Sequence, residues 1–118
     1  MSKKEQYGLV FYKQNVDGLG IRERINIKPD YEKNNILYYI ARWGKSETKA
    51  FIYDLKKSLE MQSNYEEDFF TDSTEMLEVL FVYPNITIRD ESDKNNYVFT
   101  IPMADMKELL EEWLAFIS

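Results

Sequence analysis

The carboxylates best placed to do chemistry fall into two clusters, each within a polar stretch of the chain. The first cluster contains Glu66, Glu67 and Asp68, and the second contains Asp90, Glu91 and Asp93. A glycosidase-type pair needs one carboxyl group buried, so that its pKa rises. A Ca²⁺ loop needs about six to eight oxygens and a glycine at its sharp turn. Neither cluster has that glycine, and acidic runs in loops are usually solvated. We therefore expect no catalytic residue, no metal site and no cofactor.

Two residue types are missing altogether, because the chain has no cysteine and no histidine. Without cysteine there is no disulfide framework, no thiolate nucleophile and no thiolate-bound metal. Without histidine the commonest general base and the commonest metal ligand are also missing. These absences argue against an enzyme and favour a protein that acts by binding.

Phosphate-binding motifs are incomplete. Gly18 and Gly20 follow an apolar run, but no third glycine arrives and another strand pattern comes next. A dinucleotide-binding fingerprint requires that glycine and a helix. Gly44, Lys45 and Ser46 resemble the end of a P-loop but lack its upstream glycine.

One stretch has the composition of a nucleic-acid-binding surface. Arg22, Arg24 and Lys28 alternate along a strand pattern, with Tyr7 and Tyr12 nearby in the sequence. Basic residues interleaved with aromatics can bind single strands. The formal net charge of −6 opposes this, so we expect an outward polar face and no nucleic-acid partner.

Charge is divided unequally along the chain. Residues 1–50 hold ten Lys or Arg and six Asp or Glu, a net charge of +4. Residues 51–118 hold five and fifteen, a net charge of −10. An acidic field attracts basic surfaces and repels nucleic acid and anionic lipid. The plainer alternative is that these acids only keep a small protein soluble.

Phe69 and Phe70 adjoin the first acidic cluster. Two adjacent rings cannot both face the core from one regular element. An exposed ring with an acidic rim resembles a binding hot spot. The alternative is that both rings lie under the edge of a sheet.

Most of the chain has strand patterns. Residues 7–12 are rich in strand formers, and residues 21–28 alternate apolar with polar, so the two stretches predict a hairpin with a long loop. Residues 36–43 are apolar on both faces and predict a central strand. Residues 76–83 and 97–101 predict two further strands, and residues 86–88 continue in extended form between them.

Two helices are expected. Residues 47–61 repeat apolar side chains at helical spacing, although residues 48–53 could instead extend as a strand. The last stretch, from about residue 103, repeats them at three and four, with Asp105 suited to the helix N-terminus. The predicted order is β-β-β-α-β-β-β-α. It describes an α+β protein with a largely antiparallel sheet of about five to six strands and two helices packed on one face.

The 118 residues and an aromatic content of 15% suit one domain, residues 1–118, with its own core. No run approaches ~18 apolar residues, and the first residues lack the apolar stretch of a signal peptide. A cytoplasmic location with no membrane partner is expected.

Several short motifs follow one another between residues 35 and 118. They are Tyr-Ile-Ala-Arg-Trp43, Phe51-x-x-x-Leu-Lys-Lys-Ser-Leu59, Leu77-Glu-Val-Leu-Phe81, Phe99-x-Ile-Pro-Met-Ala-Asp-Met106 and Leu-Glu-Glu-Trp113-Leu. With an acidic loop between the second and the third, this order resembles small immunity proteins of contact-dependent and polymorphic toxin systems in bacteria. The resemblance implies a cytoplasmic inhibitor that binds one toxin domain, often a nuclease, and blocks its active site or groove. It carries over no fixed functional residues.

The leading hypothesis is therefore an immunity protein that binds a basic toxin domain, and its own oligomeric state is left open. One alternative is an acidic nucleic-acid mimic or regulatory adaptor of phage or mobile-element origin, and another is a small enzyme or ligand-binding module. The residues expected to contact the partner are Glu66, Glu67, Asp68, Phe69, Phe70, Asp72, Asp90, Glu91 and Asp93.

Overall fold

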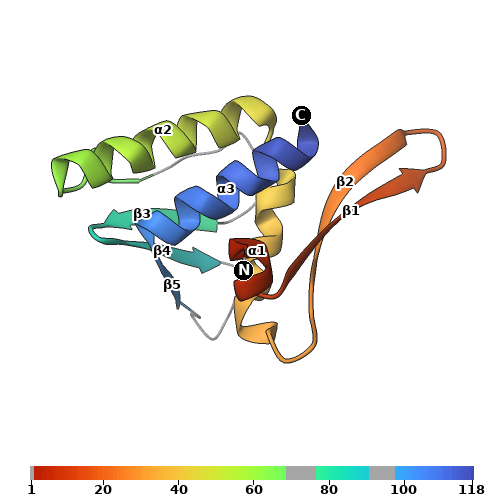
Figure 1. Ribbon diagram of the computed structural model, residues 1–118, viewed down its shortest axis with the longest axis horizontal. Helices are drawn as coiled ribbons and strands as arrows, with labels where there is room; N and C mark the ends of the chain where they lie inside the picture. The colour runs from red at the N-terminus through yellow and green to blue at the C-terminus, as the bar shows by residue number, and fades with distance from the viewer. Residues whose placement is uncertain (1, 69–76, 91–97) are drawn as a thin grey trace.

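The computed structural model describes residues 2–68, 77–90 and 98–118. Within these residues the fold is α+β, with five strands in two antiparallel sheets and four helices (Figure 1). The strands are β1 (Leu9–Val16), β2 (Gly20–Ile27), β3 (Leu77–Val82), β4 (Asn85–Asp90) and β5 (Val98–Pro102). The helices are α1 (Lys3–Gln6), η1 (Glu32–Arg42), α2 (Lys45–Met61) and α3 (Met103–Ile117).

The prediction of one sheet with five to six strands and two helices is wrong. β1 pairs only with β2 in one sheet, and the other sheet has the order β3-β4-β5. The expected third strand, residues 36–43, is part of the 3-10 helix η1. Within the part of the chain that the structure describes, no strand joins the hairpin β1-β2 to the sheet β3-β4-β5.

The burial pattern of η1 explains this error. Asn34, Leu37, Ile40 and Trp43 are buried at intervals of three residues, which is the period of a 3-10 helix. Ile36 adds to the same side and is also buried. An apolar run of this length is compatible with a buried strand or a buried helix. The interval of three is hard to recognise in the sequence, because one of its members is the polar Asn34. Its side chain is buried, where it donates a 2.9 Å hydrogen bond to the Tyr7 carbonyl.

The three-stranded sheet buries one face. Val79 and Phe81 of β3 lie opposite Ile88 and Ile86 of β4, and those two lie opposite Phe99 and Ile101 of β5. All six side chains are buried, as side-chain alternation along a strand requires for one covered face. The strands expected at residues 76–83 and 97–101 and the extended stretch at 86–88 are therefore present as β3, β5 and β4.

Both long helices cover this apolar face. Phe51 of α2 packs on Phe81, with ring centroids 5.8 Å apart, and α3 contacts α2, β4 and β5. Residues 48–53 are helical, which settles the alternative left open by the sequence. None of the described helices is long and apolar enough to cross a membrane.

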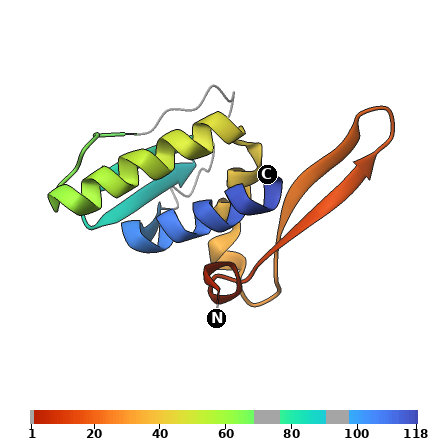
Figure 2. The ribbon, with the colours of Figure 1, turned by 45° about the horizontal axis from the view of Figure 1, so that its top comes forward.

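The hairpin β1-β2 projects from the body of the molecule and is called the arm (Figures 1 and 2). Its root is anchored because Leu9 and Ile25 are buried and the ring of Phe11 lies edge-on to Trp113 of α3, with centroids 5.0 Å apart. The strands run on to a turn of only three residues, with Gly18 at φ +80°, so the expected long loop is shorter than predicted.

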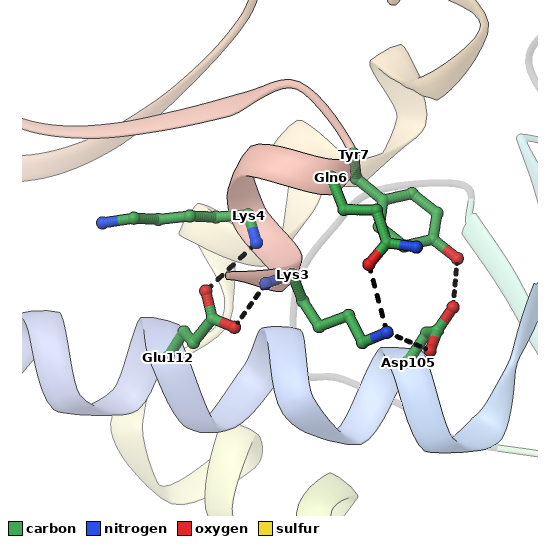
Figure 3. A network of polar contacts seen from close by, with 6 residues as sticks. All are labelled: Lys3, Lys4, Gln6, Tyr7, Asp105 and Glu112. Carbon is green, nitrogen blue, oxygen red and sulfur yellow. Dashed lines mark hydrogen bonds and ion pairs between the residues drawn. The ribbon is translucent and has the colours of Figure 1, made fainter. Parts of the chain in front are cut away.

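A polar network fastens the N-terminus to α3 beside this root (Figure 3). The Tyr7 hydroxyl donates a 2.6 Å hydrogen bond to Asp105, and Lys3 Nζ lies 3.0 Å from the same carboxylate. Glu112 accepts hydrogen bonds from the backbone amides of Lys3 and Lys4. The network therefore fixes α1 and the start of β1 against α3.

The network shifts the pKa values of Tyr7 and Asp105 in opposite directions. Burial, with the hydrogen bond to Asp105 and its charge, raises the pKa of Tyr7 well above its ordinary value. Burial opposes ionisation of Asp105, but hydrogen bonds from Tyr7 and Lys3 and the charge of Lys3 outweigh it and lower its pKa. Tyr7 therefore stays protonated and Asp105 stays ionised, a donor and an acceptor in a structural contact.

We expect Tyr7→Phe to lower the free energy of unfolding by about 1–2 kcal/mol at neutral pH, because it removes a hydrogen bond to a charged acceptor. Because the pKa of Asp105 is lowered in the folded state, ionised Asp105 contributes its full stabilisation above its pKa in the unfolded chain. That stabilisation is lost as the pH falls through its pKa in the folded protein. Because the pKa of Tyr7 is raised in the folded state, protonated Tyr7 contributes its full stabilisation below its pKa in the unfolded chain, which is ~10. That stabilisation is lost as the pH rises through its pKa in the folded protein.

Urea unfolding of wild type and Tyr7→Phe between about pH 3 and pH 11 would measure this difference. Tyr12→Phe is the matched control, since Tyr12 is exposed on the arm. An equal loss in both variants would contradict the role given to the network.

Candidate functional site

The first acidic cluster lies along the outer edge of β3. The backbone amide of Phe81 donates a 3.0 Å hydrogen bond to the Glu67 carbonyl, and an antiparallel bridge pairs Asp68 with Leu80. The side chains of Glu66 and Glu67 are exposed, and that of Asp68 is half-buried. The segment thus covers part of a sheet edge while its charges face outward.

The end of α2 directs the chain to this edge. Gln62 adopts a left-handed conformation that stops the helix. The buried Ser58 then holds the returning chain, because its hydroxyl accepts a 2.9 Å hydrogen bond from the amide of Tyr65. Asn64 accepts another from the amide of Tyr83, just beyond β3. These contacts fix the start of the acidic segment.

The remaining residues expected to contact a partner are placed less fully. Asp90 ends β4 opposite Leu77, on the far side of β3 from the first cluster. The others lie outside the described residues; they are Phe69, Phe70, Asp72, Glu91 and Asp93. The two alternatives for the phenylalanine pair therefore stay open.

Three residues that the sequence did not single out join the first acidic cluster. Tyr53 and Asp54 of α2 lie beside Tyr65 and Glu66, and the rings of Tyr53 and Tyr65 meet edge-on with centroids 6.0 Å apart. Tyr53 is 51% exposed and Tyr65 is 39% exposed. We call Tyr53, Asp54, Tyr65 and Glu66 the acidic–aromatic cluster.

Negative charge is concentrated in this cluster. Burial, together with the charge of Glu66, raises the pKa of Asp54. The neighbouring Tyr53, burial and the charges of Glu66 and Asp54 raise the pKa of Tyr65, so that its hydroxyl stays protonated. Among the described residues, neither Asp54 nor Glu66 forms an ion pair.

One positive charge lies close to the cluster, because the ammonium group of Lys57 is 5.5 Å from the centre of the Tyr53 ring. Its ion pair is with Glu60, 3.7 Å away, and not with the cluster. Two carboxylates and two tyrosine rings with little compensating charge suit an ammonium or guanidinium group, by charge-assisted hydrogen bonding and by cation–π contact.

The described part of the chain offers few groups for acid–base or metal chemistry. No three acidic side chains there come together as a metal ion would require. A cleft of about 510 Å³ is lined by residues of α1, η1 and β5, among them Tyr7 and Asn34. Both of these side chains already hydrogen-bond within the fold, so they offer no free catalytic group.

No family model matches this chain, and comparisons with curated proteins and with solved structures find no significant match. The acidic–aromatic cluster is therefore interpreted from its own chemistry.

We expect Asp54→Asn to stabilise the protein at neutral pH. The raised pKa means that ionised Asp54 is disfavoured in the folded state. The resulting loss of stability is absent below the pKa of Asp54 in the unfolded chain and appears as the pH rises through its pKa in the folded protein. Asparagine has a similar helix propensity and carries no charge. The melting temperature should rise by ~1–3 °C at pH 7 and should not change at pH 3.

Glu111→Gln provides the control for this measurement, because Glu111 pairs with Lys107 at 3.2 Å and its removal should give no gain. A loss of stability in Asp54→Asn at pH 7 would show that Asp54 is satisfied within the fold, contrary to the electrostatics described above.

Proposed function

We propose that this chain is a non-catalytic inhibitor of the immunity-protein type, acting in the cytoplasm. It binds a basic domain of a bacterial toxin and blocks that domain's active site or substrate groove. The observation that carries the proposal is the acidic–aromatic cluster, in which Asp54 and Glu66 flank the contact between two tyrosine rings and form no ion pair with any described residue. A fold that keeps two like charges together at a cost in stability favours a function for them.

Apolar surface beside the charges strengthens the proposal. Tyr53 and Tyr65 are exposed, and Met61 at the end of α2 is 54% exposed. Interface hot spots combine such anchors with polar neighbours, and tyrosine and arginine are enriched in them. A lysine or arginine of the partner could contact both a ring face and a carboxylate here.

The charge distribution gives the mechanism. Residues 51–118 carry a net charge of −10, so a basic partner is attracted over a distance before contact. Contact with the acidic–aromatic cluster and the exposed Glu67 would then hold the partner and cover its groove. Inhibition by covering needs no chemistry in the inhibitor, in keeping with the lack of histidine and cysteine.

Co-expression with the product of the adjacent gene tests this function. If that product is toxic, wild type should rescue growth, and Asp54→Asn with Glu66→Gln should rescue poorly. The affinity of the purified pair should fall at least tenfold in this double variant, because two charge-assisted contacts are lost. It should also fall steeply with salt.

Glu108→Gln with Glu111→Gln is the matched control, since it removes two charges from the exposed side of α3, away from the cluster. Equal weakening by both double variants would remove the acidic–aromatic cluster as the site. A toxic neighbour that this protein neither binds nor neutralises would reject the immunity function itself.

A further inference from the structure

The arm has more exposed surface than its own contacts require. Beyond the root, Leu19 and Ile21 at its tip are each 61% exposed, and neither packs against the hydrophobic core of the described residues. An isolated two-stranded ribbon is marginally stable in water, and its edges offer unpaired backbone groups. The arm is therefore suited to contact another molecule.

The register of the arm separates its side chains onto two faces. Leu9, Phe11 and Lys13 lie opposite Ile27, Ile25 and Glu23 on the inner face, which packs on α3 at the root. On the outer face the cross-strand pairs are Val10 with Asn26, Tyr12 with Arg24, and Gln14 with Arg22. Because side chains alternate along a strand, Lys28 continues this outer face.

The outer face is basic and exposed. It carries Arg22, Arg24 and Lys28, and none of its residues in β1 or β2 is acidic. Arg24 contacts the amide oxygen of Gln14 at 3.4 Å, but neither arginine forms an ion pair with any described residue. Tyr12 and Val10, about 40% exposed, add apolar area between the charges. The outer face is therefore complementary to an acidic surface that also carries aromatic rings or other apolar groups.

We infer that the outer face of the arm binds the acidic–aromatic cluster of a second copy of this chain. The required chemistry is present on the molecule itself, because Asp54 and Glu66 form no ion pair within the described part of the chain and two tyrosine rings flank them. Arginine pairs with carboxylates and stacks on aromatic rings, so the two surfaces are complementary.

The position of the two surfaces allows the contact to be made twice. The arm and α2, which carries Tyr53 and Asp54 at its middle, lie on opposite sides of the molecule along its longest dimension, which is 44 Å (Figure 1). A two-fold axis perpendicular to that dimension sets two copies side by side in opposite directions. Each arm then lies beside the other copy's acidic–aromatic cluster, and the assembly closes as a dimer.

The expected dimer is weak. Eight paired residues make a ribbon ~26 Å long and about 10 Å wide. Two such contacts bury on the order of 1,000 Å² in total, below the size of a standard stable interface. We therefore expect dissociation in the micromolar range. The dimer also covers the surface given above to a basic partner, so partner binding would compete with self-association.

Sedimentation velocity of the purified chain alone, from ~1 to ~300 µM, tests the inference independently of any toxin. A monomer–dimer equilibrium is expected in 25 mM salt, and its dissociation constant should rise at least tenfold in 300 mM salt, because exposed charges are screened. Monomer throughout, or open-ended growth beyond a dimer, would overturn the inference and leave the proposed function standing.

Charge reversal tests the pairing of the surfaces. Arg22→Glu with Arg24→Glu makes the arm acidic, and Asp54→Lys with Glu66→Lys makes the cluster basic. Each double variant alone should be monomeric, because like charges then meet. An equimolar mixture should form a heterodimer, since both of its contacts again join opposite charges. Failure of the mixture to associate, or dimers of either variant alone, would contradict the pairing.

Three further measurements complete the test. Lys45→Glu with Ser46→Glu, both exposed at the start of α2 and two turns from Tyr53, adds negative charge outside both surfaces and should leave the dimer intact. A fluorescent 20-nucleotide single strand should not bind. Binding that requires Arg22 and Arg24 would assign the arm to nucleic acid and overturn the inference. Melting curves show whether each variant is folded.

Discussion

α3 contacts the three-stranded sheet, α2, α1 and, through Phe11, the root of the arm. Its buried residues are Met103, Met106, Leu109, Leu110 and Trp113. Residues at both ends of the chain meet there, so the burial of one helix face fixes the position of elements that share no hydrogen-bonded ladder. Apolar packing alone would allow α1 several positions along α3. The polar network around Asp105 and Glu112 selects one of them, because its hydrogen bonds fix α1 at one place along the helix.

The arm and the acidic–aromatic cluster both depend on this arrangement. Phe11 lies against Trp113 and Phe116, so the arm leaves the body at an angle set by α3. α2 packs against α3 through its apolar side, which leaves Tyr53 on the exposed side. Neither surface contributes much to the core, and each is presented by elements that do.

Regular patterns were the predictable part of the fold. α3 and the strands β3 and β5 follow from their apolar spacing, and α2 follows from it too, although residues 48–53 were also compatible with a strand. η1 was mistaken for a strand because its buried stripe includes Asn34, whose place depends on a hydrogen bond to a distant backbone carbonyl. The separation into two sheets was equally hidden. Tyr31 packs on Gly8, where a side chain would not fit, and the chain turns there into η1.

The candidate site was predicted in part for similar reasons. The charges of Glu66, Glu67 and Asp68 are visible in the sequence, and the structure places them at the edge of β3. Tyr53 and Asp54 could be added only once residues 48–53 were known to be helical and Ser58 was known to hold the returning chain. Contacts of that kind join residues through one buried hydroxyl, and no spacing rule reports them.

The separation of these surfaces from the core affects how the sequence can change over time. Residues at the tip and outer face of the arm touch little else in the described chain, so most substitutions there should alter stability only slightly. The network at the root would still hold the arm in place. Selection could then exchange one recognition surface for another while the scaffold stays constant, and a lineage could follow a changing partner without first acquiring a new fold.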